Sequence, residues 1–262
     1  MSTDDFLARF GAVGQRQPDP VASAQSGMRN ALPKRFYEIA SVVERDGLFH
    51  VALDGRTART PARNPLAVTS AAVAEALAAE WQAQGEKIDP SVMPLTRLVN
   101  SALDGVADQH LAVRAEIVRY AGSDALCYRA EEPDALVARQ AEIWDPILAE
   151  VCARLDARFS LAKGITFAAQ PQHTLDAVAR RVDAIPAPLA LAGAHNVMTL
   201  TGSAVLALAL ADGLREADAV WDAAHLDEDY QIAIWGQDEE AAERRAIRRK
   251  EFDAAVLLLK AG

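Results

Sequence analysis

One segment of the chain, residues 188–210, is apolar and long enough to cross a membrane. Its apolar run is interrupted by Gly193 and Gly202. It also holds several polar residues, which are His195, Asn196, Thr199, Thr201 and Ser203. Because these polar groups would be costly in lipid, we expect a buried helix and no membrane insertion. Whether the segment is one helix or two, broken near Gly202, stays open at this point.

Length and charge narrow the function classes. With 262 residues, of which 51% are hydrophobic, the chain can bury a sizeable core. The formal net charge of −10 disfavours nucleic acid and anionic membrane surfaces as partners. The two cysteines, Cys127 and Cys152, form no CxxC motif, which favours a reducing compartment over a disulfide framework. The N-terminus has no apolar leader segment, so we predict a cytosolic protein in which residues 1–30 form a flexible tail.

The first part of the chain has the alternation typical of short strands. Alternating residues from position 36 lead to a turn at Asp46-Gly47, and a second alternating run ends at Asp54-Gly55, a strong hairpin signal. Residues 56–60 and 65–68 are predicted to form two further short strands. Ser70 can then cap a covering helix that has Val73, Leu77 and Trp81 on one face and ends at Gly85.

The rest of the chain is predicted to be helical. The expected helices share apolar residues at helical spacing and span residues 95–106, 109–120, 133–155, about 173–185, 188–210 and 214–224. Asp108 is a candidate cap, and Pro146 is a candidate kink or break. We therefore predict an α+β fold, with a small, mostly antiparallel β domain and covering helix (residues 31–88) and a larger all-α domain (89–262).

The C-terminal stretch, residues 226–259, joins an apolar patch to a block of charge. Gly236 is a natural helix stop and Asp238 a natural cap, so one helix should end at Trp235 and another begin near Asp238. Apolar residues at helical spacing occur only in the last two turns of the second helix, from Phe252 to Leu259. Its first three turns are therefore expected to project into water.

Few residues suggest catalytic chemistry. No phosphate-binding glycine loop, nucleophile elbow or metal-ligand spacing occurs, so we expect no metal and no cofactor. Two groups of acids could hold general acid or base groups: Asp227, Glu228 and Asp229, and then Asp238, Glu239 and Glu240. The second group also suits the positive end of a helix dipole. Trp235 fits either a core position or a partner anchor. Residues 201–203, Thr-Gly-Ser, are interpreted as a helix-packing spot.

Several motifs in one order resemble the F1-ATPase assembly chaperones that act on the α subunit, found in mitochondria and alphaproteobacteria. Each motif alone is weak, but the match runs through residues 33–250. The motifs include Lys34-Arg35-Phe36-Tyr37, Leu53-Asp54-Gly55-Arg56, Glu80-Trp81, Met93-Pro94-Leu95-Thr96-Arg97-Leu98, Tyr120-Ala121-Gly122-Ser123-Asp124, Gln140, Trp144-Asp145-Pro146, Thr201-Gly202-Ser203, Leu226-Asp227-Glu228 and Trp235-Gly236.

The resemblance implies a chaperone and not an enzyme. It implies that the chain binds unassembled F1 α subunit and prevents its aggregation until the β subunit replaces it. We expect the chain to be a monomer. It further implies that an acid after Trp235-Gly236 matters for activity: we favour Glu240, then Glu239, with Asp238 also a candidate. The expected location is the bacterial cytoplasm, or the mitochondrial matrix if the chain is eukaryotic. Two alternatives stay open: an enzyme that uses the acids with His225 on a small molecule, and a scaffold protein with another client.

Overall fold

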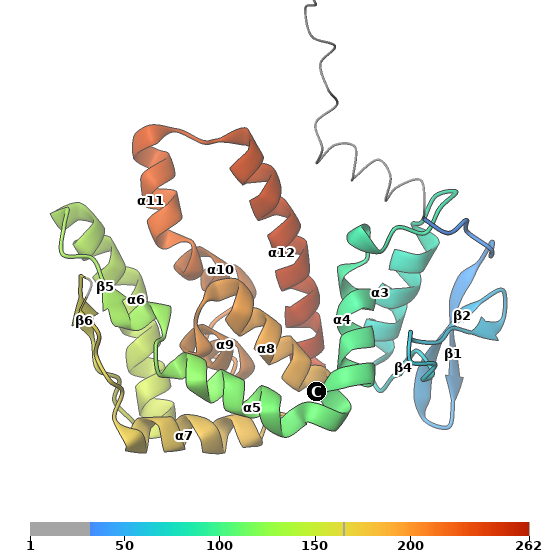
Figure 1. Ribbon diagram of the computed structural model, residues 1–262, viewed down its shortest axis with the longest axis horizontal. Coiled ribbons are helices and arrows are strands. Elements are labelled where there is room, and N and C mark those ends of the chain that lie inside the picture. The colour runs from blue at the N-terminus through green and yellow to red at the C-terminus, as the bar shows by residue number, and fades with distance from the viewer. Residues whose placement is uncertain (1–31, 165, 262) are drawn as a thin grey trace, which may run out of the picture. The chain divides into compact units, whose positions relative to one another are not determined.

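The structure is a computed structural model that describes residues 32–164 and 166–261 (Figure 1). Two short segments, residues 32–36 and 84–89, lie together in one compact unit. The amide of Arg35 donates to the carbonyl oxygen of Glu86 at 2.9 Å, and the amide of Ile88 donates to that of Pro33 at 2.9 Å. Residues 37–83 and 90–261 belong to a second compact unit. The predicted tail lies outside the described residues, and the division at residues 88 and 89 stays a prediction.

A small antiparallel sheet opens the second unit. Strands β1 (Ala40–Arg45) and β2 (Leu48–Leu53) pair from Ala40 opposite Leu53 to Arg45 opposite Leu48. Asp46 and Gly47 join them with positive φ angles of 52° and 75°, which fit a tight hairpin turn. Strands β3 (Arg56–Thr57) and β4 (Ala67–Val68) both pair with β2. The predicted sheet is confirmed, although its last two strands are shorter than expected.

Helix α3 (Ala71–Gln82) packs against strands β1 and β2. The Ser70 side chain accepts a hydrogen bond from the amide of Val73, so the predicted cap is confirmed. The helix ends three residues before Gly85, the predicted stop. Trp81 is only half-buried, because it lies at the edge of this layer with its ring 5.8 Å from that of Tyr37.

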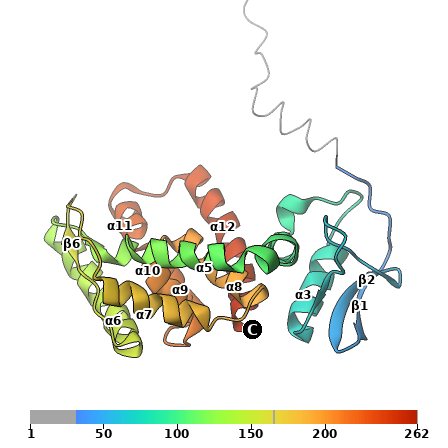
Figure 2. The same ribbon diagram turned by 60° about the horizontal axis from the view of Figure 1, so that its bottom comes forward.

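Nine α-helices beyond α3 are present in the described residues, and Figures 1 and 2 show α5 and α7 side by side. They are α4 (Pro94–Ser101), α5 (Ala107–Ala121), α6 (Asp134–Leu155), α7 (Gln172–Asp183), α8 (Leu189–Thr201), α9 (Ala204–Ala211), α10 (Ala217–Ala224), α11 (Leu226–Trp235) and α12 (Glu239–Lys260). The α+β prediction is confirmed.

Three local features differ from the predicted helices. A π-helical segment (Ala102–Val106) joins α4 to α5, so Asp108 does not cap a new helix, and the chain kinks at Gln109 instead. Helix α6 continues through Pro146. Strands β5 (Tyr128–Arg129) and β6 (Ala162–Lys163) form a small parallel pair. Strands of two residues are too short to show alternation, so their residues carry no recognisable strand pattern.

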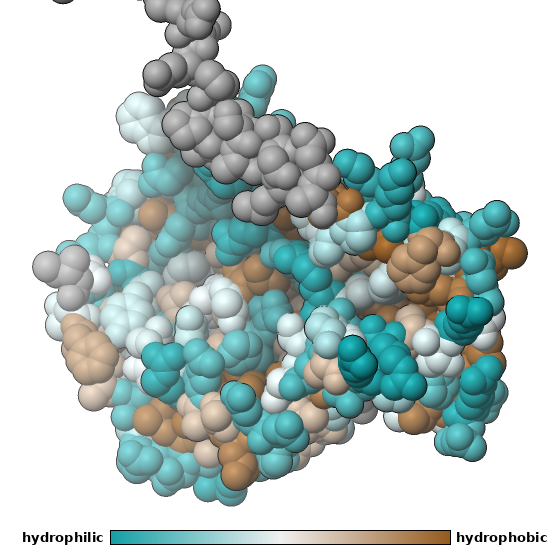
Figure 3. All heavy atoms as spheres, turned by 45° about the vertical axis from the view of Figure 1, so that its right-hand side comes forward, coloured by the Kyte–Doolittle hydropathy of each residue, from teal (hydrophilic) through white to brown (hydrophobic). Residues whose placement is uncertain are grey.

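Helices α8 and α9 form the centre of the helical core. Nearly every residue of α9 is buried, and Gly202, with φ 68°, separates it from α8. The segment 188–210 therefore forms two helices, of which α9 is almost wholly buried and α8 is buried on most of its surface. None of the helices in the described residues combines the length and apolar character that a membrane crossing needs. On the face that Figure 3 shows, hydrophilic side chains surround smaller groups of apolar ones.

Candidate functional site

The C-terminal helix pair is joined by a short corner at residues 236–238. Gly236 has φ 87° and ψ 168°, a backbone conformation essentially restricted to glycine. Asp238 then caps α12, because its carboxylate accepts the amide hydrogen of Ala241 at 2.8 Å. The predicted end of one helix at Trp235 and the start of the next at Asp238 are both confirmed.

Arginines fasten the middle of α12 to neighbouring helices. Both terminal nitrogens of Arg245 donate to the Asp229 carboxylate of α11, one of them at 3.1 Å, and this contact raises the pKa of Arg245. Two further contacts run from Arg248 to the Leu200 carbonyl oxygen and from Arg249 to Asp218. The prediction that the first three turns project freely into water is therefore wrong in part. Their acids are exposed, but Arg245, Arg248 and Arg249 contact neighbouring helices.

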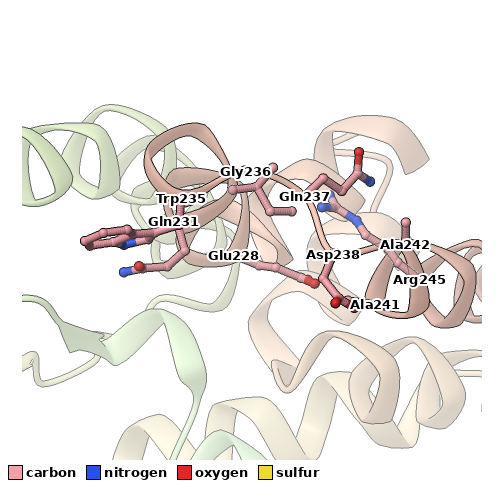
Figure 4. A pocket seen from close by; sticks show the side chains of 10 residues that line it. Glu228, Gln231, Trp235, Gly236, Gln237, Asp238, Ala241, Ala242 and Arg245 are labelled. Atoms are coloured by element: carbon pink, nitrogen blue, oxygen red, sulfur yellow. Dashed lines mark hydrogen bonds between the residues drawn. The ribbon is translucent and has the colours of Figure 1, made fainter.

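An open groove of about 210 Å³ lies between α11 and α12 (Figure 4). Its walls are mainly apolar carbon, although several of its residues are charged. In Figure 4, Glu228 extends from α11 toward Asp238, on the other side of the corner. The lining residues are Glu228, Gln231, Ile232, Trp235, Gly236, Gln237, Asp238, Ala241, Ala242 and Arg245.

Of the four predicted site residues, two lie in the groove and two lie outside it. Trp235 and Asp238 line the groove, and the Trp235 side chain is conspicuous because this residue is 81% exposed. Glu239 and Glu240 do not line it. Glu240 instead forms an exposed ion pair with Arg244, one turn further along α12. Such a pair on a helix surface contributes little to stability.

His225 lies away from these acids. It is 4% exposed, and its Nδ1 lies 2.8 Å from the carbonyl oxygen of Trp221, on whose ring it stacks. Burial lowers the pKa of His225 and so favours the neutral ring. His225 does not line the groove. Within the described residues, no group of three or more His, Cys, Asp or Glu side chains is arranged to hold a metal ion.

Comparison with known proteins identifies the family of this chain. The family description "ATP12 chaperone protein" matches residues 34–152. Atp12 from Paracoccus denitrificans is 37% identical, with a TM-score of 0.79, and the alignment covers 87% of this chain and 98% of that one. The chain belongs to the ATP12 chaperone family. The Agrobacterium tumefaciens protein Atu1473 is 46% identical over 94% of this chain and 92% of its own, with a TM-score of 0.84.

Many residues of the motifs that resemble the ATP12 family form hydrogen bonds that stabilise the fold. The Glu80 carboxylate accepts the amide hydrogens of Leu95 and Thr96 at 2.8 and 2.7 Å and so caps α4. Gln140, buried in α6, donates to the Asp227 carboxylate of α11 at 2.8 Å. These motifs therefore fix helix ends and helix contacts, whereas the Trp-Gly corner is exposed.

The ATP12-like motifs at residues 120–124 and 201–203 meet in the core. The fully buried Asp124 accepts hydrogen bonds from the Ser203 hydroxyl at 2.7 Å, the Val205 amide at 2.8 Å and the Leu126 amide at 3.0 Å. Residues 201–203 are thus a capped break between α8 and α9 that also packs against Ala125, a role that their interpretation as a helix-packing spot describes only in part. Burial raises the pKa of Asp124 to about 6, even though these donors favour the charged form.

We expect the stabilising effect of Asp124 to depend on pH. In the folded chain the Asp124 carboxyl stays protonated up to a pH of about 6, whereas the ordinary pKa of an aspartate is 3.8. Protonated Asp124 therefore stabilises the fold fully at pH values below 3.8. This stabilisation, roughly 3 kcal/mol, is lost as the pH rises through about 6. Asp124→Asn has no such titration. In urea unfolding from pH 4 to pH 7, the free energy of unfolding of wild type should fall relative to that of Asp124→Asn. A difference between the two free energies that does not change with pH would contradict this.

Of the groove residues contributed by α11, only Trp235 was named as a client-site residue from the sequence. Glu228, Ile232 and Trp235 lie at i, i+4 and i+7, so they share one face of α11. That spacing could have linked Glu228 and Ile232 to the predicted site residue Trp235. What spacing could not show is that Arg245 of α12 faces them, because this depends on the angle of the corner at Gly236. In this ATP12-family chain, the corner assembles the site.

Proposed function

We propose that this chain binds the unassembled α subunit of F1-ATPase and releases it when the β subunit takes its place. Chaperones of the ATP12 family act in assembly of F1-ATPase. The observation that most supports a client site here is Trp235, which is 81% exposed beside an apolar groove and three exposed acids. Large exposed tryptophans that no core requires are typical of interface anchors.

The mixture of groups at the site suits a temporary contact. Apolar area around Trp235 supplies attraction, while charges at the rim adjust rate and specificity more than affinity. A client held in this way is shielded from self-association and can still be displaced. We propose that the chaperone acts as a monomer in the bacterial cytoplasm, or in the mitochondrial matrix if the chain is eukaryotic.

The enzyme alternative receives no support from the site. The acids Asp238, Glu239 and Glu240 are exposed to solvent, and His225, which could assist them, is buried and bonded to the Trp221 carbonyl oxygen. The ATP12 family is one of chaperones. A scaffold with a different client is separated from our proposal by the binding experiment below.

The proposal is tested by co-expressing the chain with the α subunit of the same organism. We expect a pull-down on the chaperone to retain α, and added β subunit to displace it. Isolated α should also aggregate less when the chaperone is present. If α is not retained and its aggregation is unchanged, the proposed client is wrong.

Glu240→Lys should lower chaperone function without changing the fold. Glu240 is exposed, and its partner Arg244 lies on the same surface, so little stability depends on the pair. Reversal of the charge should weaken retention of α about tenfold if this acid contacts the client. Circular dichroism and thermal melting check the fold, and the pull-down checks function. Glu142→Lys, an exposed acid of α6, is the matched control and should behave like wild type.

A native fold together with undiminished assembly of α in Glu240→Lys would show that this acid has no such role. Glu239→Lys is the next variant to test, because Glu239 is exposed in the same first turn of α12. Loss of function in Glu239→Lys alone would move the assignment to that residue.

A further inference from the structure

The groove between α11 and α12 has a size that suits side chains of a protein partner. Its volume is about 210 Å³, below the roughly 300–1,000 Å³ usual for sites that enclose a small molecule. It is open, and its walls are mainly apolar carbon from Ile232, Trp235, Ala241 and Ala242. An apolar side chain that enters it would be removed from water on several sides, which favours binding.

The charges in the groove are not balanced. Its lining contains two carboxylates, those of Glu228 and Asp238, and one cation, Arg245. Arg245 is already held by both oxygens of Asp229, outside the lining. Glu228 lies near enough to help raise the pKa of Arg245, but it forms no ion pair within residues 32–164 and 166–261. A cation from a partner would therefore meet a carboxylate that the fold leaves available.

We infer that this groove binds a segment of the client in which an apolar side chain stands beside a lysine or arginine. The apolar side chain contacts Trp235 and Ala242, and the cation pairs with Glu228. This inference rests on the proposed function, because it takes the F1 α subunit as the client. It also gives the two parts of the predicted site separate roles. Trp235 anchors the segment within the groove, whereas Glu240 lies outside it.

Two variants test the groove in the full-length chain. Ala242→Trp fills it, and Glu228→Lys reverses the available charge. Each should weaken binding of α at least tenfold, because each removes a central contact. The matched controls are Ala115→Trp, an exposed alanine of α5, and Glu142→Lys, and both should bind like wild type. Thermal melting of every variant checks that the fold is retained.

A third measurement identifies the occupant. A photo-crosslinking phenylalanine, p-benzoylphenylalanine, is placed at position 235, and the peptide of α that it captures is sequenced by mass spectrometry. We expect one segment with an apolar residue adjacent to lysine or arginine. Raising the salt concentration should weaken binding by wild type more than binding by Glu228→Gln, because only wild type can pair a carboxylate with the cation of the client.

The outcomes separate the two claims. If wild type does not bind α, the proposed function and the groove assignment both fall. If wild type binds α while Ala242→Trp and Glu228→Lys bind it equally well, the groove inference is wrong and the proposed function stands. A captured segment without a basic residue also overturns the inference.

Discussion

Gly193→Ala is expected to lower the free energy of unfolding by about 1–3 kcal/mol, the range usual for overpacking of a core. Gly193 lies in α8 where the backbone of α12 crosses it. A Cβ atom there would stand 2.7 Å from the carbonyl oxygen of Ala255 and 2.7 Å from the amide nitrogen of Leu259. Neither atom can move by a change of side-chain rotamer, so the backbone of α8 or α12 has to shift.

The same substitution at Gly105 is the matched control. No atom lies within 4 Å of a Cβ built there, and the residue is in the π-helical segment between α4 and α5. Gly105→Ala should stabilise the chain by about 0.4–1 kcal/mol, because alanine loses less backbone freedom on folding. Urea unfolding of both variants measures the two effects. Equal stability of Gly193→Ala and wild type would show that the contact between α8 and α12 is looser than described.

Displacement of α12 should also reach the client site. Helix α12 carries Asp238, Ala242 and Arg245, while Trp235 belongs to α11. If Gly193→Ala shifts α12 relative to α11, the groove changes shape and binding of α should weaken, although Gly193 is not part of its lining. Gly105→Ala should leave binding unchanged.

Asp124→Ala is expected to cost on the order of 3 kcal/mol at neutral pH, because it leaves buried donors without an acceptor. The Ser203 hydroxyl and the amides of Val205 and Leu126 all bond to this carboxylate. Removal of the carboxylate relieves the cost of its burial, but three unsatisfied donors outweigh that gain. Asp124→Asn should lose less, since an amide oxygen can still accept some of these hydrogen bonds.

Thermal and urea unfolding measure the effect of Asp124→Ala. Asp108→Ala, an exposed aspartate of α5, is the control and should change the free energy of unfolding by no more than about 0.5 kcal/mol. If the two variants are equally stable, water or a local rearrangement satisfies the donors. The role given to Asp124 in joining α9 to the rest of the core would then be wrong.

Local signals predicted many elements of this fold. Asp46-Gly47 marked a hairpin, Ser70 a helix start, and Gly236 with Asp238 a corner between helices. These residues act through their own backbone conformation or through contacts three residues away, so the sequence nearby is sufficient. The helix that continues through Pro146 was harder to predict, because packing can outweigh the local cost of a proline.

The candidate site was predicted in part. Trp235 and the acids after Gly236 were identified as candidates from helix ends and from the resemblance, and the structure shows that Trp235 is exposed. The family itself is shown by comparison with solved structures. By itself the sequence determined local matters: where helices begin and end, which segments are apolar, and where charge accumulates. Only the tertiary structure decided that Trp235 and Asp238 share a groove while Glu240 lies outside it. The reason is physical, since helical spacing orders residues within one helix, whereas residues of two helices meet only through the angle between them.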